Sequence, residues 1–256
     1  MNQQTDTAKH SFRSGLILWC ITAMMAGGGT SGAVASDGGI SLSQTRVIFE
    51  GDRRSEKVMV TNQSGLVYLI SSRVLSTPEQ KSGGQESLPF MMTPPLFRLE
   101  SDARNAVLVV RNDTSVLPSD RESVFYLSFL AIPAVSKPAG SSAGDVMQPR
   151  VSVGIRSVIK LFYRPPGLGT SAAEAAGKLN FTMKDGVLYA ENPTPYYLTL
   201  ASLQADGRGV DVRQQDPMLP PYGSRDYRIR GSAGTVSWSV IDDYGGVSKT
   251  YSQRVR

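Results

Sequence analysis

After its first 35 residues, the chain alternates between apolar and polar residues with a period of two, in short runs bounded by Gly, Pro, Asn, Asp or Ser. This period is typical of β-strands, because neighbouring side chains on a strand point to opposite faces. The pattern predicts strands over Arg46–Glu50, Lys57–Thr61, Val67–Val74, Ala106–Arg111, Ser123–Ala131, Arg150–Arg164, Lys178–Thr182, Val187–Ala190, Tyr197–Leu203, Arg225–Ile229, Thr235–Ile241 and Ser248–Gln253. Because no long amphipathic helix is indicated, we expect an all-β protein made of two β-sandwiches.

A stretch rich in Pro, Gly and Ala, residues 166–177, separates the two groups of strands and is interpreted as a linker. We expect a first sandwich over residues 36–165 and a second over residues 178–256. In the linker, Gly167, Gly169 and Ala172 fit the G-x-G-x-x-A pattern of dinucleotide-binding sites. We reject a nucleotide site, because prolines separate the glycines from the preceding apolar run and no repeated βαβ pattern follows.

The predicted strand Arg150–Arg164 is unusually long and follows Ala134–Pro149, a run of small, proline and polar residues that we expect to be mobile. Apolar side chains occupy most odd positions of the strand: Val151, Val153, Ile155, Ile159 and Leu161. We expect Ile159 and Leu161 to face the core and the first half of the strand to extend beyond the sheet. An exposed strand edge with large apolar side chains aggregates unless a partner covers it.

The N-terminus has the three parts of a secretory signal peptide in order. Basic residues Lys9 and Arg13 precede an apolar stretch over residues 16–26, and small residues end at Ala35, where we expect cleavage. A membrane anchor would need about 20 apolar residues. We therefore predict that residues 1–35 are removed during export and that the mature chain is not stably inserted in a membrane.

Composition excludes several function classes. The only cysteine, Cys20, and the only histidine, His10, lie in the predicted signal peptide, so the mature chain lacks thiol nucleophiles, histidine-based triads and the usual zinc ligands. The only adjacent acid pair, Asp242-Asp243, would point to opposite faces of a strand. We expect no enzymatic activity, cofactor or metal.

The mature chain has 25 basic and 21 acidic residues, and the two signs are mixed, as in the run Glu50–Lys57. A nucleic-acid surface would need clustered basic residues interleaved with aromatic ones. We therefore expect no nucleic-acid partner and interpret this run as a solvated surface.

Seven motifs, in order and at fitting spacing, resemble those of the periplasmic pilus chaperones (PapD-like). They are Thr45–Phe49, Pro94–Leu99, Leu117–Ser123, Ala131–Pro133, Ile159–Pro165, Asn192–Tyr197 and Trp238–Gly246. The resemblance covers nearly all of the mature chain. It implies two immunoglobulin-like β-sandwich domains set at an angle with a cleft between them. This family is itself a known example of that fold and of strand donation, so strand donation is expected here from the resemblance.

The resemblance implies a periplasmic chaperone that binds pilus or fimbrial subunits and delivers them to an outer-membrane usher. The last strand of the first domain would complete the sandwich of the subunit, with Val151, Val153 and Ile155 as the donated side chains. Arg46 and Lys160 match the two basic residues that grip the C-terminal carboxylate of the subunit.

Glu122, Arg164 and Asp243 match the charged residues that join the two domains. Asp242 stands where Asn is common, which leaves open which of the two neighbouring carboxylates does this. The connection from Pro133 to Lys160 is long, as in the long-loop branch of the family, which would add Met147 to the donated residues. That branch usually carries a disulfide, which the mature chain cannot form, so the branch stays open.

Two other classes remain as alternatives. A secreted structural pilin or adhesin would be a single incomplete sandwich with its own N-terminal donor segment. A sugar-binding sandwich would need clustered exposed aromatic residues, for which Tyr196-Tyr197 offers a weak match.

Overall fold

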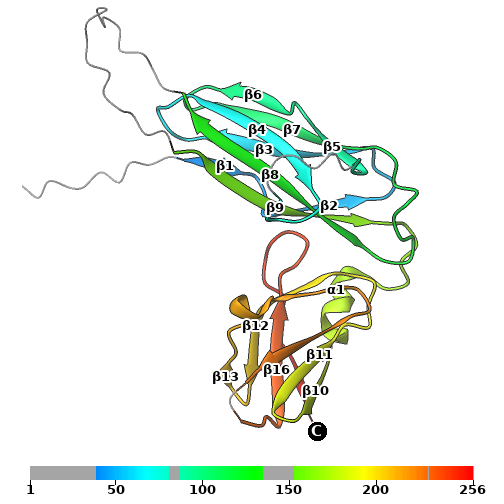
Figure 1. Cartoon of the computed structure of the whole chain (residues 1–256). Coiled ribbons are helices and arrows are strands. Elements are labelled where there is room, and N and C mark those ends of the chain that lie inside the picture. Colours follow the sequence, from blue (N-terminus) through cyan, green and yellow to red (C-terminus); the bar gives the residue numbers. More distant parts are fainter. Residues whose placement is uncertain (1–38, 81–86, 135–152, 230, 256) are drawn as a thin grey trace, which may run out of the picture. The chain divides into compact units, whose positions relative to one another are not determined.

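The computed structural model of the 256-residue chain describes residues 39–80, 87–134, 153–229 and 231–255. These residues form two β-sandwich domains (Figure 1), which confirms the predicted all-β, two-domain fold. The predicted signal peptide, Val151, Met147 and all but Ala134 of the predicted mobile run lie outside the described residues. In the part of the chain that is described, no helix is long and apolar enough to cross a membrane.

The first domain packs a four-stranded sheet against a five-stranded sheet, and the order of strands in the two sheets is β1-β3-β7-β5 and β2-β9-β8-β4-β6. The strands are β1 (Ile40–Leu42), β2 (Arg46–Glu50), β3 (Ser55–Asn62), β4 (Tyr68–Leu75), β5 (Phe90–Thr93), β6 (Leu96–Leu99), β7 (Arg104–Arg111), β8 (Ser123–Pro133) and β9 (Ile155–Arg164). All pairs are antiparallel except β2 with β9, which is parallel.

The core of the first domain follows directly from the period of two. In β2, Val47 and Phe49 are buried, whereas Arg46, Ile48 and Glu50 lie on the outer face of the sheet. Phe49 contacts Phe90 with their ring centroids 5.1 Å apart. The buried row of β2 therefore fixes which side chains of the same strand are left for the outer face.

The second domain contains a three-stranded sheet, β10-β11-β15, and a second sheet with the order β13-β12-β16-β17, in which β14 also pairs with β12. The strands are β10 (Asn180–Lys184), β11 (Val187–Glu191), β12 (Leu198–Ala205), β13 (Arg208–Gly209), β14 (Met218–Leu219), β15 (Ser224–Arg228), β16 (Thr235–Val240) and β17 (Tyr251–Arg254). Short 3₁₀ turns cover Ala176–Lys178 and Arg213–Gln215. Asp185-Gly186 joins β10 to β11 with positive φ at both residues, as a two-residue hairpin of this hand requires.

Part of the predicted linker packs into the second domain. Ser171 caps the short helix α1 (Ala172–Ala175), and Ala175 and Ala176 are buried in the core of that domain. The carbonyl of Ala176 accepts a hydrogen bond from the indole N–H of Trp238 at 2.9 Å. Because α1 has four residues and follows a sandwich strand, the glycine pattern here does not have the context of a dinucleotide site.

The predicted strand Arg150–Arg164 is wrong at its start, because β9 begins at Ile155. The last pair between β9 and β8 joins Ile155 to Ala131, and the next register positions toward the end of β8 are Ile132 and Pro133. Proline has no N–H to donate to a ladder, which limits the pairing at this end. Val153 and Gly154 therefore continue the chain outside the ladder.

Candidate functional site

Two basic residues lie side by side on the outer face of the five-stranded sheet. The parallel register of β2 and β9 pairs Arg46 with Lys160, Ile48 with Phe162 and Glu50 with Arg164. Residues that are paired in a parallel ladder have side chains on the same face. The fold thus brings together Arg46 and Lys160, which are more than a hundred residues apart in the sequence, as neighbouring cations.

The guanidinium of Arg46 is partly satisfied. Its Nη1 donates a hydrogen bond to the carbonyl of Ile241 at 3.2 Å, whereas its buried Nε has no hydrogen-bond partner in the part of the chain that the structure describes. The guanidinium also lies 5.9 Å from the ring centroid of Phe162. Burial lowers the pKa of Arg46, although the carboxylates of Asp243, Asp242 and Glu122 act in the opposite direction.

Lys160 has a less favourable environment. Burial lowers the pKa of its ammonium group, and the positive charge of Arg46 lowers it further, against a weaker opposite effect of Asp216. Among the described residues, none forms a hydrogen bond or an ion pair with the ammonium group. Within the described ranges, the Nε of Arg46 and the ammonium group of Lys160 have no hydrogen-bond partner, and two such neighbouring cations have the chemistry that suits an anion.

The edge of β9 beside this pair is open. Strand β2 pairs with Lys160–Arg164 only, whereas β8 pairs with Ile155–Tyr163 on the opposite side. Residues 155–159 therefore have one neighbouring strand among the residues that the structure describes. Leu161 is buried in the core and Ile159 packs against it, but Ile155 is 54% exposed and Val153 is 69% exposed. Of the predicted donor side chains, Ile155 thus lies exposed at this open edge, and Val153 lies exposed just before it.

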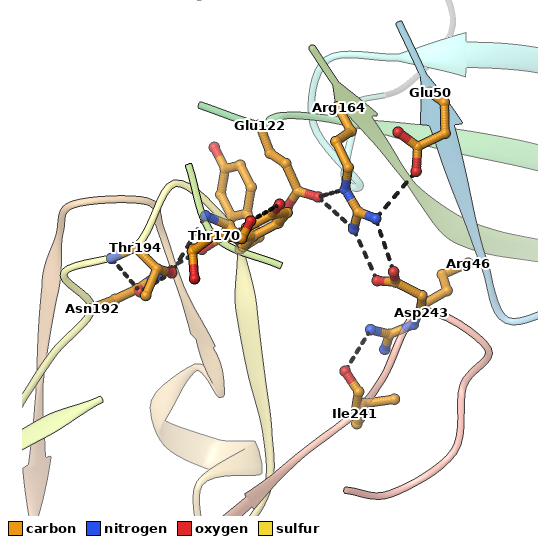
Figure 2. Close-up of polar contacts among 11 residues, drawn as sticks. Arg46, Glu50, Glu122, Arg164, Thr170, Asn192, Thr194, Ile241 and Asp243 are labelled. Atoms are coloured by element: carbon orange, nitrogen blue, oxygen red, sulfur yellow. Dashed lines mark hydrogen bonds and ion pairs between the residues drawn. The ribbon is translucent and has the colours of Figure 1, made fainter. Parts of the chain in front are cut away.

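Arg164 joins three carboxylates (Figure 2). Its guanidinium binds Asp243 through two hydrogen bonds of 2.9 and 3.0 Å, Glu122 at 2.9 Å and Glu50 at 3.2 Å. The guanidinium also packs over the ring of Tyr196, whose centroid lies 4.9 Å away. Burial lowers the pKa of Arg164, but the hydrogen bonds and charges of Asp243 and Glu122 outweigh this effect and raise the pKa.

Asp243 belongs to the second domain, and the structure answers the question that the sequence left open between the two aspartates. The carboxylate of Asp243 binds Arg164, whereas that of Asp242 accepts hydrogen bonds from the N–H groups of Tyr244 and Gly246 in its own loop, at 2.9 and 2.7 Å. Asp242 therefore shapes the loop after β16, and Asp243 links this loop to β9.

Glu122 is 3% exposed and lies just before β8. Its second carboxylate oxygen accepts a hydrogen bond from the N–H of Tyr197 at 2.8 Å. Burial raises the pKa of Glu122 to about 7, against the opposing charge of Arg164 and the hydrogen bond from Tyr197. The single cation Arg164 is shared with Glu50 and Asp243, so it compensates the burial of Glu122 only in part.

The turn that presents the N–H of Tyr197 is held by Asn192. The side chain of Asn192 donates to the carbonyls of Tyr196 and Pro220 and accepts from the N–H and hydroxyl of Thr194, as Figure 2 shows in part. Tyr196 is buried, with its hydroxyl donating to the carbonyl of Thr170 at 2.6 Å. Because Tyr196 is buried, the tyrosine pair does not form the exposed aromatic platform that a sugar-binding protein would need.

Both domains contribute to a pocket of about 320 Å³ next to Arg46. Its lining includes Arg46 and Phe162 from the first domain, and Tyr197, Ile241 and Tyr244 from the second. The pocket combines the guanidinium of Arg46 with aromatic and aliphatic walls and with the carboxylates of Glu122, Asp242 and Asp243. Glu122 and Asp243 are bound by Arg164, and Asp242 is bound by N–H groups of its own loop. The guanidinium and the apolar walls are therefore the groups that suit a chain end with a carboxylate and apolar side chains.

Comparison with known protein families identifies the family to which this chain belongs. Residues 39–169 match the model described as "Pili and flagellar-assembly chaperone, PapD N-terminal domain", and residues 174–252 match "Pili assembly chaperone PapD, C-terminal domain". The chain belongs to the PapD family of pilus-assembly chaperones. This is a family of periplasmic chaperones and not of enzymes.

Individual members of the PapD family agree over most of their length. The chaperone protein LpfB of Salmonella typhimurium is 36% identical over 223 residues, which cover 85% of this chain and 90% of LpfB. The crystal structure of the E. coli chaperone DraB superposes with a TM-score of 0.71 at 32% identity, covering 86% of this chain and 97% of DraB. A complex of the Salmonella enterica SafA pilin with the SafB chaperone matches with a TM-score of 0.71 at 27% identity, covering 84% of this chain and 96% of the matched chain.

Some members of the PapD-family site were not predicted from the sequence. Glu50 was assigned to a solvated run, but it lies on the same face as Arg46 and binds Arg164. The carbonyl of Ile241 and the N–H of Tyr197 are backbone groups, for which side-chain patterns give no signal. The alternation of Arg46, Ile48 and Glu50 along β2 was the available signal for Glu50. No cluster of three metal-ligating side chains occurs in the described part of the chain.

Proposed function

We propose that this chain is a periplasmic chaperone that holds a pilus subunit at the open edge of β9 and anchors the C-terminal carboxylate of that subunit between Arg46 and Lys160. One observation carries the proposal: two adjacent cations, with an unpaired buried donor, lie at the point where the open edge of β9 ends. The proposal also includes signal-peptide cleavage after Ala35, the domain limits given above and delivery of the subunit to an outer-membrane usher.

The anchor has a clear electrostatic rationale. In the free chaperone, burial disfavours the charged forms of Arg46 and Lys160, and the charge of Arg46 adds to this effect for Lys160. A carboxylate placed between them would accept charge-assisted hydrogen bonds from both groups and would raise the pKa of each. Because a chain has only one C-terminal carboxylate, this contact would also fix the register of the strand that precedes it.

The open edge of β9 supplies the second part of the interaction. A strand added along residues 155–159 would satisfy the free backbone groups of that edge. Val153 and Ile155, together with Val151, would then fill an apolar groove in the subunit. Burying a large aliphatic side chain stabilises a complex by roughly 1.5–3 kcal/mol, so three such residues contribute a substantial part of the affinity.

The anchor can be tested directly. A tagged form of the chain is purified from a periplasmic extract, and the subunit that accompanies it is identified by mass spectrometry. The double variant Arg46→Ala/Lys160→Ala should retain at least about a hundredfold less of that subunit, because an unpaired buried carboxylate costs several kcal/mol.

The control variant Lys57→Ala/Arg208→Ala removes the same charge from two exposed positions and should retain the subunit at the wild-type level. Circular dichroism establishes that both variants are folded. Equal retention by the anchor variant and the wild type would show that the carboxylate is bound elsewhere.

A further inference from the structure

Tyr244 is the most exposed of the described large hydrophobic residues, at 96%. It lies in the loop after β16, and this loop is well ordered by its own hydrogen bonds. Asp242 accepts from the N–H of Tyr244 and from that of Gly246, and its carbonyl accepts from Gly245 at 3.1 Å. Gly245 has a φ of +86°, a conformation that suits glycine. The exposure of Tyr244 is therefore a feature of a defined loop.

The loop is also fixed to the first domain at the proposed anchor. The carbonyl of Ile241 accepts a hydrogen bond from Arg46, and Asp243 is held by two hydrogen bonds from Arg164 (Figure 2). Tyr244 borders the pocket that contains Arg46 and Phe162. Tyr244 thus lies in a fixed loop and lines the same pocket as the cation that would receive the carboxylate of the bound pilus protein.

The chemistry of this position favours a polypeptide end as the occupant. A carboxylate bound at Arg46 and Lys160 brings the last side chains of its own chain to the rim of the same pocket. Tyr244 and Val247, which is 66% exposed, present apolar surface in that loop. Tyrosine supplies a large contact area with few rotatable bonds, so its burial costs little conformational entropy.

We propose that Tyr244 packs against the last side chains of the bound subunit, so that the second domain helps to select which pilus proteins are accepted by their C-terminal residues. This inference rests on the proposed function, since it places the C-terminal carboxylate of the pilus protein at Arg46 and Lys160. It adds a contact from the second domain to an interaction otherwise assigned to the first.

The test uses a fluorescent peptide of the last fifteen residues of the co-purified subunit, with a free C-terminal carboxylate, and fluorescence anisotropy with the full-length mature chaperone. Tyr244→Ala should weaken binding by about tenfold, as expected for removal of an aromatic contact. The matched control Tyr189→Ala removes an exposed tyrosine from β11 and should leave the affinity unchanged.

A second peptide, with glycine in place of the last two side chains, locates the contact. If Tyr244 touches these side chains, Tyr244→Ala and the glycine peptide should not have additive effects, and the variant should bind the glycine peptide nearly as well as the wild type does. Additive effects, or an unchanged affinity of Tyr244→Ala for the first peptide, would overturn the proposal.

A third peptide, with an amidated C-terminus, separates this proposal from the proposed function. Amidation and Arg46→Ala/Lys160→Ala should each abolish most of the binding whether or not Tyr244 contributes. If both do so while Tyr244→Ala has no effect, only the role of Tyr244 fails. If neither has an effect, the carboxylate anchor itself fails.

Discussion

The charge balance around Arg164 depends on one carboxylate, Glu122. Three acids share this arginine, and Glu122 is the most deeply buried of them. The charged and polar groups that act on it are Arg164 from the first domain and Asp243 and the N–H of Tyr197 from the second. The protonation of Glu122 is therefore coupled to the contact between the domains.

Glu122→Gln should change the pH dependence of stability. The pKa of Glu122 is raised from 4.5 to about 7 in the folded protein, so the folded state binds the proton more tightly than the unfolded state. Relative to the variant, the wild type should be most stable at pH 4.5 or below. It should lose up to about 3 kcal/mol as the pH rises to 7 and change little above that value.

Urea unfolding of both proteins between pH 4 and pH 8 measures this difference. Asp226→Asn, which removes an exposed carboxylate from β15, controls for the loss of one negative charge. A difference between wild type and Glu122→Gln that stays constant over this pH range would contradict a raised pKa.

At the residue level, the sequence indicated the side chains of the site but not their partners. Arg46, Lys160, Glu122, Arg164 and Asp243 were all named from the family resemblance, and the fold brings them together on β2, β9 and the adjoining loops. The choice between Asp242 and Asp243 depended on which carboxylate faces the loop and which faces Arg164. Sequence position alone cannot distinguish these two neighbours.

The two halves of strand β9, which meet near Ile159, have different surroundings. Its second half is a core strand with neighbours on both sides, whereas its first half has β8 on one side only among the described residues. Exposed side chains in the first half are free to bind a partner. The chaperone itself does not need them for its core.

Val153→Asp should therefore abolish subunit binding without unfolding the chaperone. Val153 is 69% exposed, so a carboxylate is tolerated there in the free protein, but it would enter an apolar groove without a partner in the complex. Val116→Asp is the matched control, because Val116 is 79% exposed and lies in the connection between β7 and β8.

Thermal unfolding of the free variants and co-purification of the subunit measure the two effects. Both variants should unfold within about 1 kcal/mol of the wild type, and only Val153→Asp should lose the subunit. Equal retention of the subunit by the two variants would contradict strand donation by this segment.

The alternation of apolar and polar residues identified the strands in which one face is buried. One of these is β2, whose limits agree with the prediction. It missed β5 and β6, because Pro94 and Pro95 separate two short apolar runs and Phe90–Thr93 contains the adjacent apolar residues Met91 and Met92. The start of β9 could not be predicted from its own residues. It depends on where the partner strand β8 reaches Pro133.

Each domain of the molecule has its own hydrophobic core, and the charged contacts of Arg164 connect them. Arg164→Ala would leave Glu122 buried without its cation and would remove both hydrogen bonds to Asp243. Removing one partner of a buried pair costs about 3–5 kcal/mol. We expect the variant to unfold in two separate calorimetric transitions, one for each core.

Arg98→Ala is the control for this experiment, because Arg98 forms an exposed ion pair with Glu100 at 2.6 Å on β6. Such surface pairs contribute about 1 kcal/mol or less, so this variant should unfold as the wild type does. A single transition for Arg164→Ala, at the wild-type temperature, would show that other contacts couple the domains.

The position of β2 along the edge of β9 also limits how far an added strand can extend. Strand β2 occupies the edge from Lys160 onward, so an added strand that follows the direction of β9 must stop where β2 begins. In the proposed complex, the last residue of the bound pilus protein lies where the open edge of β9 ends at β2, next to the two cations. In the same register, extra C-terminal residues would extend past Arg46 and Lys160 into the position that β2 occupies. The proposed complex would therefore exclude subunits whose chains continue beyond the anchored residue.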